Sequence, residues 1–495
     1  MAQVTVSYAG FPGIYYVLRR RSLVCGNVRD LHELSALEQA RAVRDRVVSP
    51  VELTRHYLDR IERIDPRVGA YVTVTADRAL EQARLLEKEL PDGPLAGVPI
   101  PVKDLNLVKD VPIMFGSATY REFVSPVDDT VVERLRDAGT VMLGKTATPE
   151  FGLPCYTETA VSPPARSPWD PVTSAGGSSG GAAAAVAAGL APAAQGSDGA
   201  GSIRIPASVC GLYGIKPTRG RISFAPIIPD LAGLSTNGPI ARTVADAAAL
   251  LDVMTHNTPG DHYLAPPHEG TFLEAARREP GRLRIARHAD PVVPGAVVEP
   301  AVLAAYEEAS ATLAALGHEI VDIVPSYGPD LVPHFVTLWC SFACMHPVAD
   351  DMTGMLRPLT AWLRERGFAT PAPAFLQAQA ALQLATRAAL AATAGYDAIL
   401  TPTVTQPPRP VGWFEDVDGP EETFERMTRF AAFPALYNVT GQPAVNLPLH
   451  WTDGGLPIGV MLAGRVGGED TLISLSAQVE AARGGFWGER RPALW

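Results

Sequence analysis

Two serine clusters and one lysine are the residues of this sequence whose types and spacing could do chemistry. Ser178 lies in a run of four glycines, and Ser202 follows the small residues 199–201. Small residues before a serine let several backbone N–H groups converge on one point, which is the geometry of an oxyanion hole. Lys103 directly follows an apolar segment, where burial would lower its pKa and make the neutral amine available as a base. The pattern predicts a serine nucleophile activated by a lysine.

Each feature also has an ordinary structural interpretation. A single glycine-serine cluster is typical of a tight turn, and Lys103 could reach solvent or pair with Asp104. Two such clusters 24 residues apart, each next to helix or strand signals, are not typical of linkers. We therefore favour the chemical interpretation.

Two short motifs indicate other chemistries. The segment 139–146 has P-loop spacing, but a helix is expected before it and a strand at 140–143, where the N–H groups would be used in a sheet. The segment 176–180 has nucleophile-elbow spacing, but no strand precedes it, and His346 and His450 lack supporting context as the late histidine. We expect neither a nucleotide site nor a Ser-His-Asp triad.

The elements that must position these groups alternate along the chain. Ser49-Pro50-Val51-Glu52 is a capping box, and we expect its helix to end at Asp65-Pro66. Further helices are predicted at about 76–90, 131–138, 182–188 and 300–315, and through 355–394. Strands are predicted at 97–102, 140–143, 396–400, 443–448 and 458–462. This alternation favours an α/β fold with one large sheet.

On these motifs the chain resembles the amidase-signature hydrolases over residues 31–495. The matching segments are 97–104, 144–152, 168–170, 176–181 and 196–220. The resemblance implies a single large α/β domain whose mixed, twisted central sheet is surrounded by helices. We expect this catalytic domain at 29–495 and a dispensable N-terminal extension at 1–28.

The resemblance also assigns roles. It implies a Ser–cis-Ser–Lys triad in which Ser202 is the nucleophile, Ser178 relays the proton and neutral Lys103 is the base. The implied oxyanion hole consists of the N–H groups of Gly199, Ala200, Gly201 and Ser202. The implied supporting residues are Ser179, Asp198 and Arg204. No metal or cofactor is implied.

The chain departs from the family pattern near the expected substrate pocket. Ala200 stands where many members have Gly, and Met461 stands where Gln is frequent. Our pocket candidates are Leu153, Cys155, Thr157 and Cys340, although Cys340 is also interpretable as a packed core cysteine. The segments 200–211 and 489–494 resemble general amidases and 6-aminohexanoate cyclic-dimer hydrolases.

Composition excludes several classes of protein. The chain has 495 residues, 47% of them hydrophobic and 19% charged, which is too apolar for a disordered protein. Its net charge of −11 and lack of a long basic run argue against a nucleic acid partner. We see no membrane span, and five cysteines in so long a chain do not form a disulfide framework. We therefore expect a reduced, cytoplasmic protein.

The expected function is hydrolysis of a small amide through an acyl-enzyme, releasing a carboxylic acid and ammonia or an amine. Two alternatives stay open: the amidase subunit of a glutamyl-tRNA(Gln) amidotransferase, and a non-catalytic binding protein on the same scaffold. The substrate is open among aliphatic, aryl, cyclic and carbamate compounds. The oligomeric state is also open, with a homodimer as one option.

Overall fold

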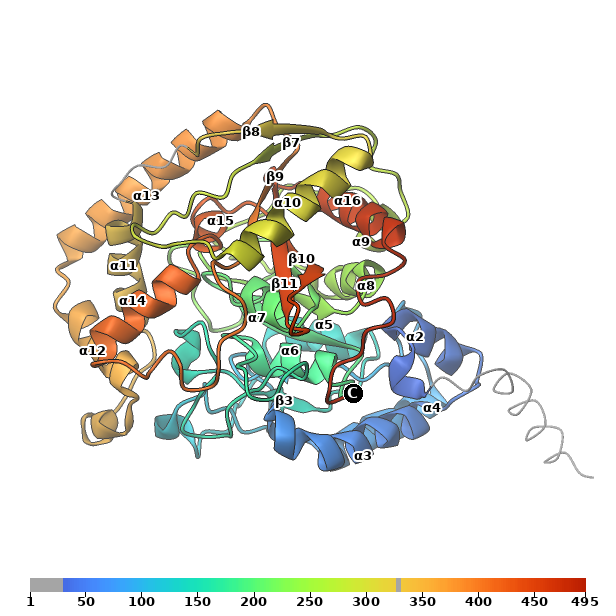
Figure 1. Cartoon of the computed structure of the whole chain (residues 1–495). Coiled ribbons are helices and arrows are strands. Elements are labelled where there is room, and N and C mark those ends of the chain that lie inside the picture. The colour runs from blue at the N-terminus through green and yellow to red at the C-terminus, as the bar shows by residue number, and fades with distance from the viewer. Residues whose placement is uncertain (1–29, 326–330) are drawn as a thin grey trace, which may run out of the picture.

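A large mixed sheet forms the centre of the computed structural model, which describes residues 30–325 and 331–495 (Figure 1). Eight of the described strands form this sheet, in the order β4-β6-β5-β10-β11-β9-β7-β8. Their bounds are β4 Ala193–Asp198, β5 Tyr213–Lys216, β6 Thr236–Ala241, β7 Arg284–Arg287, β8 Glu319–Asp322, β9 Ala398–Pro402, β10 Ala444–Trp451 and β11 Pro457–Gly464. The strands from β4 to β9 pair antiparallel, and β9, β7 and β8 pair parallel. The predicted α/β fold with a mixed sheet is confirmed.

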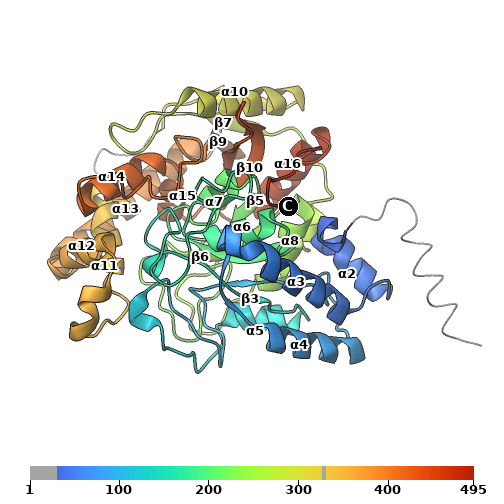
Figure 2. The same ribbon diagram turned by 60° about the horizontal axis from the view of Figure 1, so that its bottom comes forward.

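The middle of this sheet is buried on both faces. All residues of β9 and β11 are buried, which explains why β11 is a continuous apolar run rather than an alternating one. A tight turn at 452–456 joins β10 to β11, and Asp453, Gly454 and Gly455 provide its turn residues. Helices cover the sheet on its two faces (Figure 2).

A second, smaller sheet was not anticipated from the sequence. It consists of β1 Tyr71–Val74, β3 Gly144–Thr146 and β2 Val102–Lys103, in the order β1-β3-β2. The expected strands 97–102 and 140–143 are joined only by a single β-bridge, between Pro99 and Val141. Regular pairing begins only where β2 lies parallel to β3. Lys103 is therefore the last residue of a short strand.

The helices wrap around both sheets, and their bounds are as follows. The first half of the chain has α2 Ala36–Arg44, α3 Pro50–Val68, α4 Ala76–Lys88, α5 Thr130–Asp137, α6 Gly180–Ala187, α7 Arg204–Val209 and α8 Val244–Met254. The second half has α9 Phe272–Ala275, α10 Pro300–Ala315, α11 Leu331–Phe342, α12 Pro358–Phe368, α13 Ala372–Thr393, α14 Pro420–Phe430, α15 Ala435–Val439 and α16 Glu469–Ala482. Short 3₁₀ turns lie at Leu31–Glu33, Ala118–Tyr120, Glu150–Gly152 and Asp350–Met355.

The predicted capping box at the start of α3 is present, with Ser49 and Glu52 each bonding to the other's backbone N–H. The predicted end of this helix at Asp65-Pro66 is wrong. Pro66 lies inside the last turn, and α3 ends at Val68, followed by the C-cap Gly69, whose φ is 67°. Pro66 removes one helical donor, but the carbonyl it leaves unpaired belongs to the exposed residue Glu62, where solvent can satisfy it.

Helix α6 lies in the interior, and each of its residues is buried. A Cβ on Gly181 would lie 2.3 Å from the backbone N of Ala147 and 2.5 Å from the carbonyl oxygen of Ala70. Only glycine fits there, which explains the small residues at the start of α6. This packing holds the segment that carries Ser178 against the small sheet.

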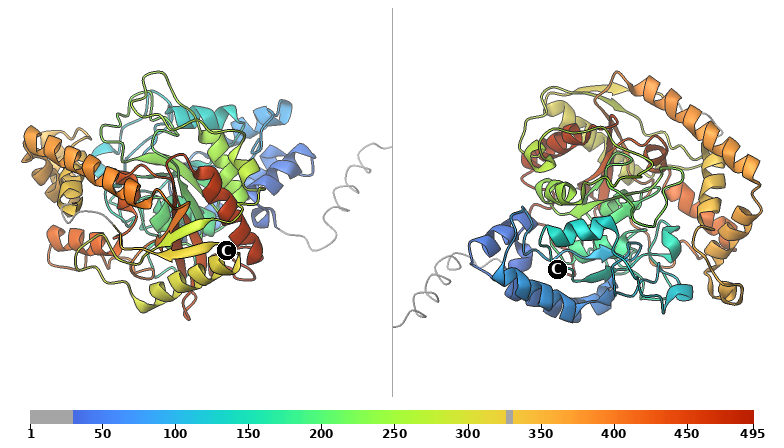
Figure 3. Two further views of the ribbon diagram at one scale, coloured as in Figure 1. Left: turned by 90° about the horizontal axis from the view of Figure 1, so that it is seen from above. Right: turned by 180° about the vertical axis from the view of Figure 1, so that it is seen from behind.

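Helices α11 to α14 gather on one side of the molecule (Figure 3). Helix α11 packs against α12 and α13, and α12 packs against α14. No helix among the described residues is long and apolar enough to cross a membrane. The expected extension at 1–28 lies outside the described residues.

Candidate active site

Lys103 is fully buried where β2 ends, and its side chain reaches the first serine cluster. Its Nζ lies 2.8 Å from Ser178 Oγ and 3.0 Å from Ser197 Oγ. Burial lowers the pKa of Lys103 to about 7, and the nearby Asp198 carboxylate opposes this shift only in part. Near neutral pH much of this amine is therefore uncharged and able to accept a proton.

Ser178 lies in a loop that packs tightly on the segment 155–157. The peptide bond between Gly177 and Ser178 is cis. A Cβ on Gly177 would lie 2.7 Å from the backbone N of Tyr156, so the close approach requires glycine. The Thr157 hydroxyl donates to the Gly176 carbonyl over 2.8 Å. These contacts hold Ser178 beside Lys103.

The loop that carries Ser202 is organised by the Asp198 carboxylate at the end of β4. This carboxylate accepts hydrogen bonds from the N–H groups of Gly201 and Ile203, at 2.7 and 3.1 Å. It also forms a buried bidentate ion pair with Arg204, at 2.8 and 2.9 Å. Burial alone would raise the pKa of Asp198, but the Arg204 guanidinium holds it well below its usual range.

Asn438 in α15 completes this group, and nothing in the sequence analysis pointed to it. Its side chain donates to Asp198 Oδ1 over 2.9 Å and accepts from Arg204 Nη2 over 2.6 Å. The sequence carries no local signal for this role, because Asn438 is 240 residues from Asp198. A second Arg204 nitrogen, Nη1, lies 3.2 Å from the sulfur of Met461, the residue that departs from the family pattern.

The geometry corrects one member of the expected oxyanion hole. The N–H of Gly201 donates to Asp198, so it is not available to a ligand. Within the part of the chain that the structure describes, no hydrogen bond engages the N–H groups of Gly199, Ala200 or Ser202. Ala200 is not among the described residues with a left-handed φ, so its extra methyl group introduces no backbone strain. Three N–H groups of this loop are therefore without a partner among the described residues.

Backbone and hydroxyl contacts join the two serine loops. The N–H of Ser179 donates to the Ser202 carbonyl over 3.0 Å, and the Ser179 hydroxyl donates to the Ser197 carbonyl over 3.0 Å. The structure thus links Lys103 directly to Ser178 and links Ser202 to the same loop through its backbone. The hydroxyls of Ser178 and Ser202 are not hydrogen-bonded to each other, but both residues line one cavity.

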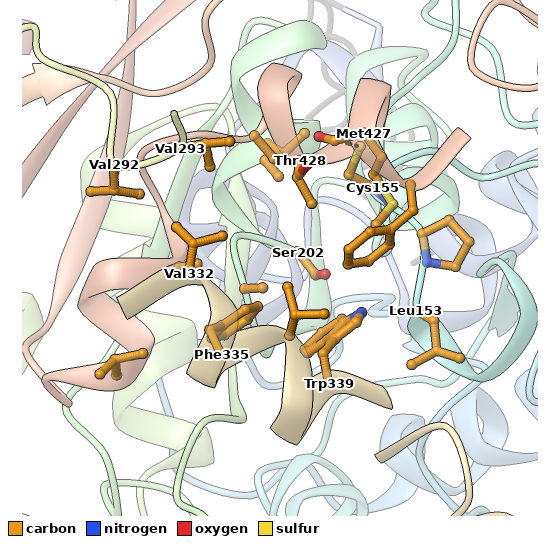
Figure 4. Close-up of a pocket in the computed structure, with 18 of the residues that line it drawn as sticks. Leu153, Cys155, Ser202, Val292, Val293, Val332, Phe335, Trp339, Met427 and Thr428 are labelled. Atoms are coloured by element: carbon orange, nitrogen blue, oxygen red, sulfur yellow. Dashed lines mark hydrogen bonds between the residues drawn. The ribbon is translucent and has the colours of Figure 1, made fainter. Parts of the chain in front are cut away.

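Two cavities meet at Ser202. The larger, about 410 Å³, contains Ser178 and Ser197, and the smaller, about 70 Å³, lies between α11 and α14 (Figure 4). Of the predicted pocket residues, Leu153 lines both cavities and Cys155 lines the smaller one. The other two, Thr157 and Cys340, are not among the residues that line these two cavities. The Thr157 hydroxyl is held by the Gly176 carbonyl, and Cys340 is 3% exposed in the core, as its alternative interpretation predicted.

The residues of the other two motifs have structural roles. Lys145 of the P-loop-like segment pairs with Asp104 over 3.0 Å and donates to the Asn106 carbonyl, so its ammonium is occupied. His450 lies 2.7 Å from Glu308, and His346 stacks on an aromatic ring; neither is hydrogen-bonded to a serine. Among residues 30–325 and 331–495, no three His, Cys, Asp or Glu side chains converge as a metal site requires.

A comparison with known families agrees with this fold and with its buried lysine beside two serine loops. Residues 52–473 match the family model described as "Amidase". The chain therefore belongs to the amidase signature family, as its motifs indicated, and it is an enzyme that hydrolyses carbon–nitrogen bonds.

The relatives include both groups that the sequence resembled. The chain is 38% identical over 474 residues to the putative amidase AmiB2 of Mycobacterium tuberculosis, covering 94% of this chain and 99% of that protein. It is 36% identical over 482 residues to the 6-aminohexanoate-cyclic-dimer hydrolase of Paenarthrobacter ureafaciens, covering 93% and 96%. A solved structure of 6-aminohexanoate cyclic dimer hydrolase complexed with substrate superposes with a TM-score of 0.85 at 34% identity, covering 94% of this chain and all of that chain.

Proposed function

We propose that this amidase cleaves its substrate through Ser202, Ser178 and Lys103 and an acyl-enzyme on Ser202. The observation that carries the proposal is the 2.8 Å contact between a fully buried lysine amine and the Ser178 hydroxyl. An uncharged amine in that position can accept the Ser178 proton, and Ser178 can take the Ser202 proton in the same step.

The reaction then follows in two halves. Ser202 Oγ attacks the amide carbonyl, and its proton moves through Ser178 to Lys103. The proton returns from Lys103 to Ser178 and passes from Ser178 to the leaving nitrogen, the carbon–nitrogen bond breaks, and an amine or ammonia departs. Water repeats the sequence on the resulting ester and releases the carboxylic acid.

The developing oxyanion would be stabilised by the free N–H groups of Gly199, Ala200 and Ser202. Removing one such donor typically slows an acyl transfer about 10²–10³-fold. Asp198 supports this arrangement indirectly, because it fixes the backbone on either side of Ser202. Its role is positioning rather than contact with the substrate.

The test is covalent labelling with a fluorophosphonate, followed by intact-mass analysis and peptide mapping. We expect one adduct, on Ser202, absent in Ser202→Ala and at least about 100-fold slower to form in Lys103→Met. Labelling of another residue, or none in the folded wild-type chain, would overturn the proposal.

Lys216 offers a matched control. It is fully buried, and burial lowers its pKa to about 7, as for Lys103, but its Nζ donates to the Pro217 carbonyl. Lys216→Met also removes a buried amine, without touching either serine. We expect it to label within about threefold of wild type. Equal losses in the two lysine variants would assign the effect of Lys103 to packing.

A further inference from the structure

Ser202 lies where two cavities with different lining residues meet. Three residues line both of them, Leu153, Ser202 and Trp339. Figure 4 shows Ser202 in the middle of the smaller cavity's lining, with Leu153 and Cys155 on one side and Val292 and Val293 on the other. A substrate whose carbonyl carbon is attacked by Ser202 must therefore extend into one cavity on each side of that carbon.

The smaller cavity has a largely apolar lining. None of its described residues carries a charge, and its walls include Val332 and Phe335 of α11 and Phe424 of α14. Apart from Ser202 and the indole of Trp339, which also line the larger cavity, its polar side chains already have partners. The Cys155 thiol faces the Met427 carbonyl at 3.8 Å, and the Thr428 hydroxyl donates to the Glu425 carbonyl over 3.0 Å. Away from these two shared residues, the cavity therefore offers no charged group and no unpaired polar side chain.

The larger cavity contains the proton-transfer groups. Ser178 and Ser197, the two hydroxyls that contact Lys103, lie in its wall, and neither lines the smaller cavity. Its far side is aromatic, with the Phe151 ring stacked on His346 at 4.6 Å between centroids. Asp230 also lies in its lining. The two sides of Ser202 thus differ in access to the proton relay.

This difference orients the substrate, if the function proposed above is correct. The leaving nitrogen must receive its proton from Ser178, so the amine part lies in the larger cavity. The oxyanion points at the free N–H groups around Ala200. The remaining substituent of the tetrahedral carbon is the acyl chain, and the smaller cavity is the space left for it.

We propose that the cavity between α11 and α14 is the acyl pocket, and that the enzyme acts on amides of uncharged, apolar carboxylic acids. A carboxylate or ammonium on the acyl chain would lose its solvation there and find no partner. We expect kcat/KM for an apolar acyl group to exceed that for a charged group of similar length at least about 100-fold.

Two substrate series test the assignment. One series keeps 4-nitroaniline as the amine and varies the acid: acetyl, butyryl, hexanoyl, succinyl and 6-aminohexanoyl. The other keeps the butyryl group and varies the amine. We expect butyryl or hexanoyl to be preferred in the first series, with the two charged acyl groups at least about 100-fold poorer. A succinyl or 6-aminohexanoyl substrate as good as the hexanoyl one would overturn the assignment.

Substitutions on opposite walls locate the pocket. Val332→Phe from α11 and Thr428→Phe from α14 each fill the smaller cavity, and both should shift the preference toward acetyl while the ranking of amines stays the same. Ile227→Phe adds comparable bulk to the larger cavity, where Ile227 is 62% exposed. It should change the ranking of amines and leave the acyl ranking as in wild type. The reverse pattern would refute the orientation.

Fluorophosphonate labelling separates this inference from the proposed function. If Ser202 is labelled in all three variants but the rankings contradict these expectations, the orientation is wrong and the triad stands. If wild-type Ser202 is not labelled, the triad itself is wrong. Because Val332 and Thr428 lie on different helices, a folding defect in one variant leaves the other as the test.

Discussion

The pH dependence of Ser202 labelling tests the state of Lys103 most directly. Burial lowers the pKa of this amine from 10.5 to about 7. The neutral fraction is then about one half at pH 7, about one tenth at pH 6 and about one hundredth at pH 5. With an unshifted pKa it would be only about 1 in 3,000 at pH 7. The base must be unprotonated to act, so the labelling rate should rise with pH and level off above about pH 8.

The assay is the fluorophosphonate labelling rate in wild type from pH 5 to pH 10, in buffers of constant ionic strength. We expect about a tenfold change per pH unit below pH 6. Since the pKa of Lys216 is also lowered to about 7, Lys216→Met shows which lysine produces the profile. It should keep the profile of wild type. A rate that is flat from pH 5 to pH 7, or that still rises at pH 10, would refute the reasoning.

Three further predictions concern stability. At every pH below about 10.5, burial of the Lys103 amine reduces the free energy of unfolding, because the lowered pKa disfavours the charged form in the folded chain. Lys103→Met should therefore raise the melting temperature at pH 7. This gain should vanish as the pH approaches 10.5. Asp198→Asn leaves Arg204 with an unpaired buried charge and should lower the free energy of unfolding by about 3–5 kcal/mol in urea titrations, with slower labelling of Ser202. A chain beginning at Val28 should keep the activity and melting temperature of the full chain; a loss of either would contradict the dispensable extension.

Local sequence patterns were sufficient for some of the elements. The capping box of α3 and the apolar segments of β10 and β11 depend on interactions between near neighbours, so they can be read without a fold. The serine loops could also be identified, because glycines and small residues at close spacing have few uses other than tight backbone approach. The predicted strand at 140–143 was not found, because the position at which two strands begin to pair is set by their register, and local sequence does not encode register.

The tertiary structure alone decided which groups meet. Lys103 and Ser178 are 75 residues apart, and their 2.8 Å contact exists only because the small sheet and the buried α6 pack together. Asp198 captures the Gly201 N–H and is itself held by Asn438, a contact across 240 residues. The two cavities arise from side chains of helices distant in sequence. Residue types therefore determined what chemistry the chain can perform. Long-range packing decided which proton acceptor, N–H donors and cavity walls surround Ser202, because these depend on distances that no local pattern specifies.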